Sequence, residues 1–199
     1  MDQSQLDLFE ASPSLPNGFR YQPDFLTADE ESDLVGRFAT LSFKEFEFRG
    51  YRGNRRVLSF GWQYDFNRME LQRTDDMPEF LLQLRERAAR IASLEASDLQ
   101  HVLLTEYAPG AGIGWHRDKP VFAEVVGISL GSPCLFRFRR KAGLKWERAS
   151  VVAEPRSAYL LQGPSRMEWE HSIPAVDRLR YSITFRSFKP SHYLSQSAY

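Results

Sequence analysis

Apolar residues recur at helical spacing in the first half of the chain and in short extended runs in the second half. The first helical pattern follows Thr27-Ala28-Asp29-Glu30, a capping box in which Thr27 is the N-cap and Glu30 reaches back to it. The apolar positions of this pattern are Leu34, Val35, Phe38 and Leu41. We therefore expect an amphipathic helix that begins at this box.

A second helical pattern begins near Asp76-Met77-Pro78, with Pro78 expected in the first turn. The apolar stripe of this predicted helix consists of Phe80, Leu81, Leu84, Ala88 and Ile91. Between the two helices, residues 48–56 combine arginines with two glycines. We expect this basic segment to be irregular.

After residue 98 the pattern changes to short apolar or alternating runs that are separated by glycine and proline. These runs cover residues 101–107, 124–130, 135–139, 148–153, 158–162 and 179–185. Short strands at such spacing are typical of a sandwich, a jelly roll or a barrel. The sequence therefore predicts an α+β fold, in which two helices pack on one side of an all-β half.

Composition limits the class of protein. With 199 residues, of which 42% are hydrophobic, the chain can bury one core and form one domain. No run approaches the roughly 18 apolar residues that a membrane span needs, and the first residues lack the regions of a secretory signal. The single cysteine, Cys134, is expected to be a small buried hydrophobe in a reducing compartment. We expect a cytoplasmic protein that does not bind membranes, with a monomer as the default.

The clearest candidate for chemistry is the His-x-Asp motif of His116 and Asp118. In an extended segment these two side chains point to the same side and can bind one ion, although such a pair also arises by chance. His171 lies far enough along the chain for intervening strands to return beside the pair. Two imidazoles and one carboxylate leave three positions of an octahedral ion open, as in non-haem iron(II) oxygenases. Zinc is the competing ion, but sulfur ligands are missing here. The other histidines, His101 and His192, are expected to be ordinary surface or hydrogen-bonded residues.

A candidate anion site lies near the end of the chain. Residues 180–186 alternate, so that Arg180, Ser182, Thr184 and Arg186 share one face of a predicted strand. Two arginines and two hydroxyls suit a polar pocket inside a barrel, where a guanidinium can bind a carboxylate with two hydrogen bonds. The alternative is an edge strand with one solvated face.

The motifs occur in a specific order, which is residues 104–110, His116-x-Asp118, residues 129–131, residues 163–166, His171 and residues 180–186. In this order and spacing, over about residues 57–188, the chain resembles the AlkB family of iron(II)- and 2-oxoglutarate-dependent dioxygenases. The resemblance implies a double-stranded β-helix, or jelly roll, with the N-terminal helices packed on one side. It also implies oxidative dealkylation of nucleic-acid bases in DNA, or alternatively in RNA. In the implied reaction, iron(II) would be bound as the cofactor and 2-oxoglutarate and O2 would be consumed. An aldehyde, succinate and CO2 would be released.

The resemblance also implies roles for single residues. Iron would be held by His116, Asp118 and His171. The distal carboxylate of 2-oxoglutarate would pair with Arg180 and the hydroxyl of Tyr107, and Arg186 would lie near its chelating carboxylate. Thr105 and Ser182 stand where family members often carry asparagine, so cosubstrate contacts there are expected to be rearranged.

Substrate contacts are expected from two groups of residues upstream. Trp62, Tyr64 and Phe66 alternate with polar residues and resemble the aromatic part of a substrate lid, although a half-buried core strand would give the same pattern. The arginines Arg49, Arg52, Arg55 and Arg56 resemble a phosphate grip. They are a local basic cluster in a chain of net charge zero. Lys119 and Pro120 stand where some relatives carry acidic residues, so the preferred lesion is expected to differ.

These interpretations give one domain over residues 19–190, with a flexible arm over 1–18 and a tail over 191–199. Within the domain, the substrate lid would span residues 48–68 and the jelly-roll core residues 99–188. Two alternatives remain open from the sequence. The same oxygenase chemistry could act on a methylated protein side chain, or the domain could be a non-catalytic β-barrel that binds a ligand.

Overall fold

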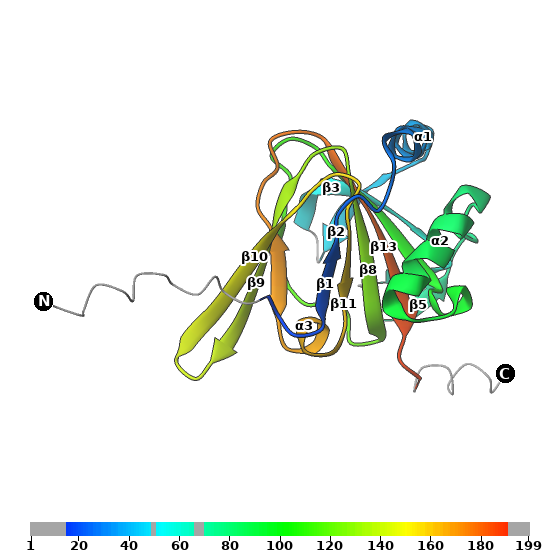
Figure 1. Ribbon diagram of the computed structural model, residues 1–199. Coiled ribbons are helices and arrows are strands. Elements are labelled where there is room, and N and C mark those ends of the chain that lie inside the picture. Colours follow the sequence, from blue (N-terminus) through cyan, green and yellow to red (C-terminus); the bar gives the residue numbers. More distant parts are fainter. Residues whose placement is uncertain (1–14, 49–50, 66–69, 191–199) are drawn as a thin grey trace, which may run out of the picture.

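The computed structural model describes residues 15–48, 51–65 and 70–190 and consists mainly of two antiparallel sheets that face each other (Figure 1). The larger sheet contains, in order across it, β1 (Phe19–Gln22), β11 (Ala158–Leu161), β8 (Phe122–Leu130), β13 (Arg180–Phe188), β6 (His101–Tyr107), β3 (Tyr51–Phe60) and β2 (Lys44–Phe48). The smaller sheet contains β10 (Lys145–Ala153), β9 (Cys134–Ala142), β12 (Glu170–Ile173) and β7 (Ile113–His116). A separate hairpin is formed by β4 (Trp62–Asp65) and β5 (Glu70–Arg73).

From β6 to β13 the chain passes repeatedly between the larger and the smaller sheet. This winding is that of a double-stranded β-helix, so the fold class predicted from the sequence is confirmed. The helical elements are α1 (Ala28–Phe38), α2 (Glu79–Ala92), a short 3₁₀ helix (Ala96–Asp98) and α3 (Gly163–Met167). No helix among the described residues is long and apolar enough to cross a membrane.

Helices α1 and α2 cover the outer face of the larger sheet, on the side away from the smaller sheet (Figure 1). The capping box predicted before α1 is confirmed, because the Thr27 hydroxyl accepts from the Glu30 backbone and Glu30 accepts from the Thr27 backbone. Helix α2 begins at Glu79, one residue later than expected. Pro78 has extended rather than helical backbone angles and is therefore its N-cap. The buried side chains of the two helices are Leu34, Phe38, Leu81, Leu84, Ala88, Ala89 and Ala92.

For the described residues 48 and 51–56, the expectation of an irregular segment is wrong, because β2 and β3 pair antiparallel and β3 continues the larger sheet beside β6. Alternation explains this pairing: Leu58 and Phe60 pack in the core beneath the helices, whereas Arg55 and Val57 belong to the opposite face of the strand. In the sequence, the arginines and glycines of this segment interrupt the alternation of apolar and polar residues that indicates a strand. The ladder also depends on β6, which lies far along the chain.

Gly61 ends β3 and separates it from the β4 hairpin. Its φ angle is +77°, and a Cβ atom at this position would lie 2.2 Å from the carbonyl oxygen of Gln100. The aromatic positions on the two sides of Gly61 therefore belong to different strands. Phe60 belongs to the core under the helices, and Trp62 and Tyr64 belong to the separate hairpin.

Strand β13 lies between β8 and β6 in the middle of the larger sheet, so the edge-strand alternative is wrong. Its apolar residues Tyr181, Ile183 and Phe185 pack in the core beneath the helices. The polar set on its other face is also buried and faces the space between the two sheets, and consists of Arg180, Ser182, Thr184 and Arg186. The fold thus encloses a polar surface next to a second apolar core that includes Tyr107, Phe136, Phe138 and Tyr159.

Candidate active site

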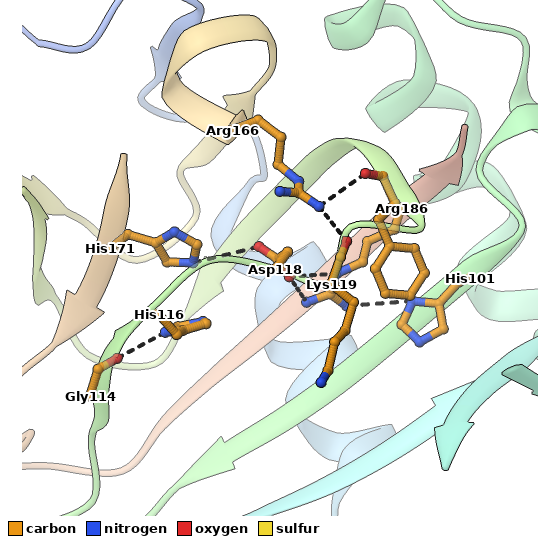
Figure 2. Close-up of polar contacts among 9 residues, drawn as sticks. His101, Gly114, His116, Asp118, Lys119, Arg166, His171 and Arg186 are labelled. Carbon is orange, nitrogen blue, oxygen red and sulfur yellow. Dashed lines mark hydrogen bonds and ion pairs between the residues drawn. The ribbon is translucent and has the colours of Figure 1, made fainter. Parts of the chain in front are cut away.

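His116 and His171 lie side by side on neighbouring strands of the smaller sheet (Figure 2). They are cross-strand partners of β7 and β12, and their ring centroids are 4.3 Å apart. Asp118 follows β7, and its Oδ2 lies 3.6 Å from Nε2 of His171. The three side chains that the sequence suggested as metal ligands are therefore brought together between the two sheets.

Neighbouring groups orient both imidazole rings. Nδ1 of His116 lies 2.8 Å from the carbonyl oxygen of Gly114. Because a carbonyl can only accept, Nδ1 carries the proton and the lone pair is on Nε2. The His171 ring stacks on Phe136 with centroids 5.3 Å apart and an interplanar angle of 15°.

The electrostatic surroundings keep these groups in forms that bind metal. Burial lowers the pKa of His171 to about 3, and the neighbouring His116 acts in the same direction. Burial also lowers the pKa of His116. For Asp118, burial acts to raise the pKa, but Arg186 and the two histidines outweigh it and hold the pKa well below its usual range. At neutral pH the cluster therefore consists of two neutral imidazoles and one carboxylate.

The chemistry of this donor set fits iron(II). Among the described residues, no three His, Cys, Asp or Glu side chains already form a complete group around an ion. The Asp118 oxygen nearer to His171 and the ring of His116 nevertheless belong to one half-buried cluster. Two nitrogen donors and one oxygen donor are the set that leaves positions for a cosubstrate and oxygen.

Three further buried side chains support the cluster (Figure 2). Arg186 binds Oδ1 of Asp118 through Nε at 2.9 Å and Nη2 at 2.7 Å. His101 lies behind this arginine, with Nδ1 3.4 Å from Nη1 of Arg186. Nη2 of Arg166 donates to the carbonyl oxygens of Lys119 at 2.6 Å and of Phe122 at 2.9 Å, which fixes the loop after the aspartate.

The supporting roles of His101 and Arg166 were not found from the sequence. His101 is buried and is the cross-strand partner of Arg186, a relationship that becomes visible once β6 and β13 are paired. The expectation of an ordinary residue is thus refined, because His101 is in contact with the arginine that holds Asp118. Arg166 is the last residue of the motif of residues 163–166. The position of this motif shortly before His171 was the sequence signal that could have indicated its role.

Arg180 forms a buried cationic site on the same inner face. Its side chain has no exposed surface, its Nη2 donates to Ser129 Oγ at 3.2 Å, and its guanidinium carbon lies 4.9 Å from the centroid of the Tyr107 ring. Within the described part of the chain, its Nε and Nη1 are buried without a hydrogen-bond partner. Unpaired donors on a buried cation fit a carboxylate ligand. Thr105 and Ser182 are buried cross-strand partners on the same strands, one row from Arg180 and Tyr107.

The candidate substrate residues are separated by the fold. Lys119 Nζ lies 4.6 Å from the centroid of the Tyr64 ring, so Tyr64 of the β4–β5 hairpin is beside the loop that follows Asp118. Trp62 packs instead against Phe188, with centroids 5.7 Å apart. Phe66, predicted to be the third aromatic of the lid, lies outside the described residues.

The predicted arginine cluster does not form one surface in the described residues. The Arg55 guanidinium stacks on Phe46 at 3.8 Å and is close enough to His116 to influence its pKa. Arg56 is on the opposite face of β3 and binds both oxygens of Glu106 at 2.7 Å. Arg49 and the side chain of Arg52 lie outside the described residues.

Comparison with known proteins connects this geometry to a family. The chain matches the model of the 2OG-Fe(II) oxygenase superfamily over residues 18–186. It is 25% identical over 210 residues to an "Alkylated DNA repair protein ALKBH8 homolog" of Arabidopsis thaliana. It is also 32% identical over 124 residues to "Alpha-ketoglutarate-dependent dioxygenase AlkB" of Escherichia coli K12, and 30% identical over 122 residues to "Probable RNA/DNA demethylase ALKBH6" of Danio rerio.

The alignments with these relatives are partial. They cover 92%, 55% and 60% of this chain, and 58%, 55% and 49% of the length of the relatives. Among solved structures, the chain superposes on OsALKBH1 with a TM-score of 0.68 at 19% identity, covering 87% of this chain and 98% of the other. A prolyl-4-hydroxylase of Pseudomonas putida gives a TM-score of 0.59 at 15% identity, covering 86% and 93%. These structures share the fold. The family match extends over most of the chain, so this protein belongs to the 2OG-Fe(II) oxygenase superfamily, with iron(II), 2-oxoglutarate and O2 as its cofactors, and the curated relatives confirm its resemblance to AlkB proteins.

Proposed function

We propose that this oxygenase removes alkyl groups oxidatively from nucleic-acid bases. The observation that carries the proposal is the convergence of His116, Asp118, His171 and Arg180 on the space between the two sheets, with Tyr64 beside the loop that follows the aspartate. The substrate class is supported by relatives that are named as an alkylated-DNA repair protein and a probable RNA/DNA demethylase.

In this proposal the metal is held by Nε2 of His116, Nε2 of His171 and a carboxylate oxygen of Asp118. When bound, iron, 2-oxoglutarate and O2 would supply an oxidant for the alkyl carbon, with succinate and CO2 as coproducts, and the alkyl group would be released from the base nitrogen as an aldehyde. Arg186 holds the other oxygen of Asp118 and so fixes the orientation of the carboxylate. The buried imidazoles remain neutral, so they stay available as ligands at neutral pH.

Arg180 anchors the cosubstrate in this proposal. Its two unpaired donors would bind the distal carboxylate of 2-oxoglutarate, with the hydroxyl of Tyr107 beside them. Thr105 and Ser182 would line the same face, and Arg186 would lie near the other end of the cosubstrate. Enclosure between two sheets would exclude water from the reacting atoms.

Tyr64 supplies a flat surface next to this site for an extruded base. Lys119 lies on the Tyr64 ring and would place a cation at the edge of the base rather than an acidic side chain. We propose that Trp62, Phe66 and the arginines Arg49, Arg52 and Arg55 contribute to the surrounding lid. Among these, Arg55 stacks on Phe46 and influences the pKa of His116. It would therefore act near the base rather than on a distant phosphate.

The proposal is tested by single-turnover chemistry with defined lesions. Protein loaded anaerobically with iron(II) and 2-oxoglutarate is mixed with air and with DNA or RNA oligonucleotides that carry 1-methyladenine, 3-methylcytosine or ethenoadenine. We expect loss of the alkyl mass in step with succinate release, and neither product with His116→Ala. A methylated peptide is the comparison substrate. Succinate release that is stimulated by the peptide and not by any oligonucleotide would contradict the proposal and favour the protein substrate.

A further inference from the structure

A second tyrosine lies in the space between the sheets near Arg180, and the reaction proposed above assigns it no role. Tyr159 of β11 is buried, with 7% of its surface exposed, and belongs to the apolar core between the two sheets. Its ring packs against Phe136 with centroids 4.7 Å apart. Phe136 is also the residue on which His171 stacks, so Tyr159 is close to the candidate metal cluster.

Gly127 leaves the space that the Tyr159 ring occupies over the neighbouring strand. Gly127 on β8 is the cross-strand partner of Tyr159 on one side and of Thr184 of β13 on the other. A Cβ atom on Gly127 would lie 2.1 Å from Cζ of Tyr159 and 2.4 Å from its hydroxyl oxygen. The phenol end of the ring therefore lies over β8 in the space that a side chain would fill, next to the strand β13 that pairs with Gly127 on its other side.

The Arg180 guanidinium also lies against the inner face of β8. It bonds to Ser129, which lies two residues from Gly127 on the inner face of β8. Burial raises the pKa of Tyr159 well above its ordinary value, and Arg180 is the strongest opposing charge. The phenol is therefore protonated at neutral pH and can donate a hydrogen bond in the neighbourhood of this guanidinium.

We propose that the Tyr159 hydroxyl is a third donor to the distal carboxylate of 2-oxoglutarate, beside Arg180 and Tyr107. A carboxylate offers about four lone-pair sites, which is enough for the guanidinium and two phenols. Gly127 is part of this arrangement, because it provides the space through which the tyrosine reaches the ligand. The inference depends on the assignment of Arg180 as the cosubstrate anchor in the proposed function.

The test measures binding rather than turnover. 2-Oxoglutarate is titrated by calorimetry into protein loaded with Mn(II), which does not support the reaction, for the wild type, Tyr159→Phe and Tyr21→Phe. Tyr21 is a matched control, because it is the cross-strand partner of Tyr159 on β1 while its hydroxyl accepts from the backbone nitrogen of Glu154 at 3.1 Å. The affinity for Mn(II) alone is measured for each protein.

We expect Tyr159→Phe to weaken 2-oxoglutarate binding about tenfold, as for the loss of one hydrogen bond to a charged group, with Tyr21→Phe unchanged. The affinity for Mn(II), and for 2-oxobutyrate, which lacks the distal carboxylate, should be the same in Tyr159→Phe and the wild type. Gly127→Ala should weaken 2-oxoglutarate binding as well, because the added carbon displaces the ring. Equal 2-oxoglutarate affinities of folded Tyr159→Phe and wild type would overturn the inference. Loss of binding with Arg180→Met in the same series would show that the anchor assignment still stands.

Discussion

Arg186 holds a single oxygen of the Asp118 carboxylate, with Nε 2.9 Å and Nη2 2.7 Å from Oδ1. The other oxygen, Oδ2, is on the side of His171. The arginine therefore selects the carboxylate oxygen that is left for a metal. It does so from β13, a strand of the opposite sheet from the one that carries the two histidines.

Arg186→Gln should weaken metal binding by roughly ten- to a hundredfold, as is typical when the partner that orients a ligand is removed. The measurement is a titration with Mn(II) followed by electron paramagnetic resonance. Arg156→Gln is a control with the same change of charge, since Arg156 pairs with Glu31 of α1, away from the candidate metal ligands. Unchanged affinity in Arg186→Gln would mean that the carboxylate does not need this orientation.

Arg180→Met should abolish the stabilisation by 2-oxoglutarate and leave the ligand-free protein at least as stable as the wild type. The substitution removes a buried charge whose Nε and Nη1 lack partners in the described residues, and such charges cost stability. In the wild type, ligand at 100 times its dissociation constant should add about 2.7 kcal/mol to the free energy of unfolding. Thermal unfolding with and without the ligand gives both quantities. A marked fall in the melting temperature of the ligand-free variant would contradict the expectation.

The metal-free protein should lose stability as the pH falls below about 6.5. His101 is fully buried, and burial together with Arg186 lowers its pKa well below the ordinary value. The unfolded chain therefore takes up a proton in this range that the folded chain excludes, and the free energy of unfolding decreases as pH falls. His116 and His171 have shifts of the same sign.

His101→Gln should reduce this dependence by up to about 1.4 kcal/mol per pH unit, the contribution of one proton. Urea unfolding of the metal-free protein at pH 7.5, 6.5 and 5.5 measures the slope directly. The comparison does not depend on the overall stability of the variant, because the change of the free energy of unfolding with pH is determined separately for each protein. Identical slopes for His101→Gln and the wild type would show that His101 is not protonated on unfolding in this range.

Tyr64→Ala should lower kcat/KM for an alkylated oligonucleotide by about tenfold or more, the usual effect of losing one base-stacking contact. The slow release of succinate without a nucleic-acid substrate should be unchanged, because Tyr64 of the β4–β5 hairpin lies beside Lys119, whereas the proposed cosubstrate residues Tyr107 and Arg180 lie on β6 and β13. A parallel fall in both rates would instead indicate a disturbed loop after Asp118. Tyr21→Phe serves again as the remote control.

Much of the fold follows from local patterns in the sequence. The capping box at Thr27 and the strand over residues 101–107 correspond directly to α1 and β6. The polar face of residues 180–186 is also found, because alternation over a whole strand is a strong signal. The prediction of an irregular basic segment before Val57 is wrong, because this segment forms a strand through pairing with β6 rather than through its own composition.

The part of the candidate site that lies in sequence motifs could be predicted, whereas contacts between neighbouring strands could not. His116, Asp118 and His171 were found from residue type and spacing, and the structure places them together. The contact of His101 with Arg186 was not found, because a cross-strand relationship requires knowledge of the register. The same holds for the position of Tyr159 over Gly127, where the signal is the absence of a side chain on a neighbouring strand.

The alignment of His116 opposite His171 has a consequence for how the folded state is selected. A slip of β12 by one residue would turn His171 to the outer surface and remove one of the proposed ligands. If these residues hold iron as proposed, the ion would bind the correct register and not the slipped one, and binding would shift the population towards correctly paired chains. Iron would then favour the correct pairing of β7 and β12 as well as serve as a cofactor. A shortage of the metal would first appear as a mixture of strand registers in the smaller sheet.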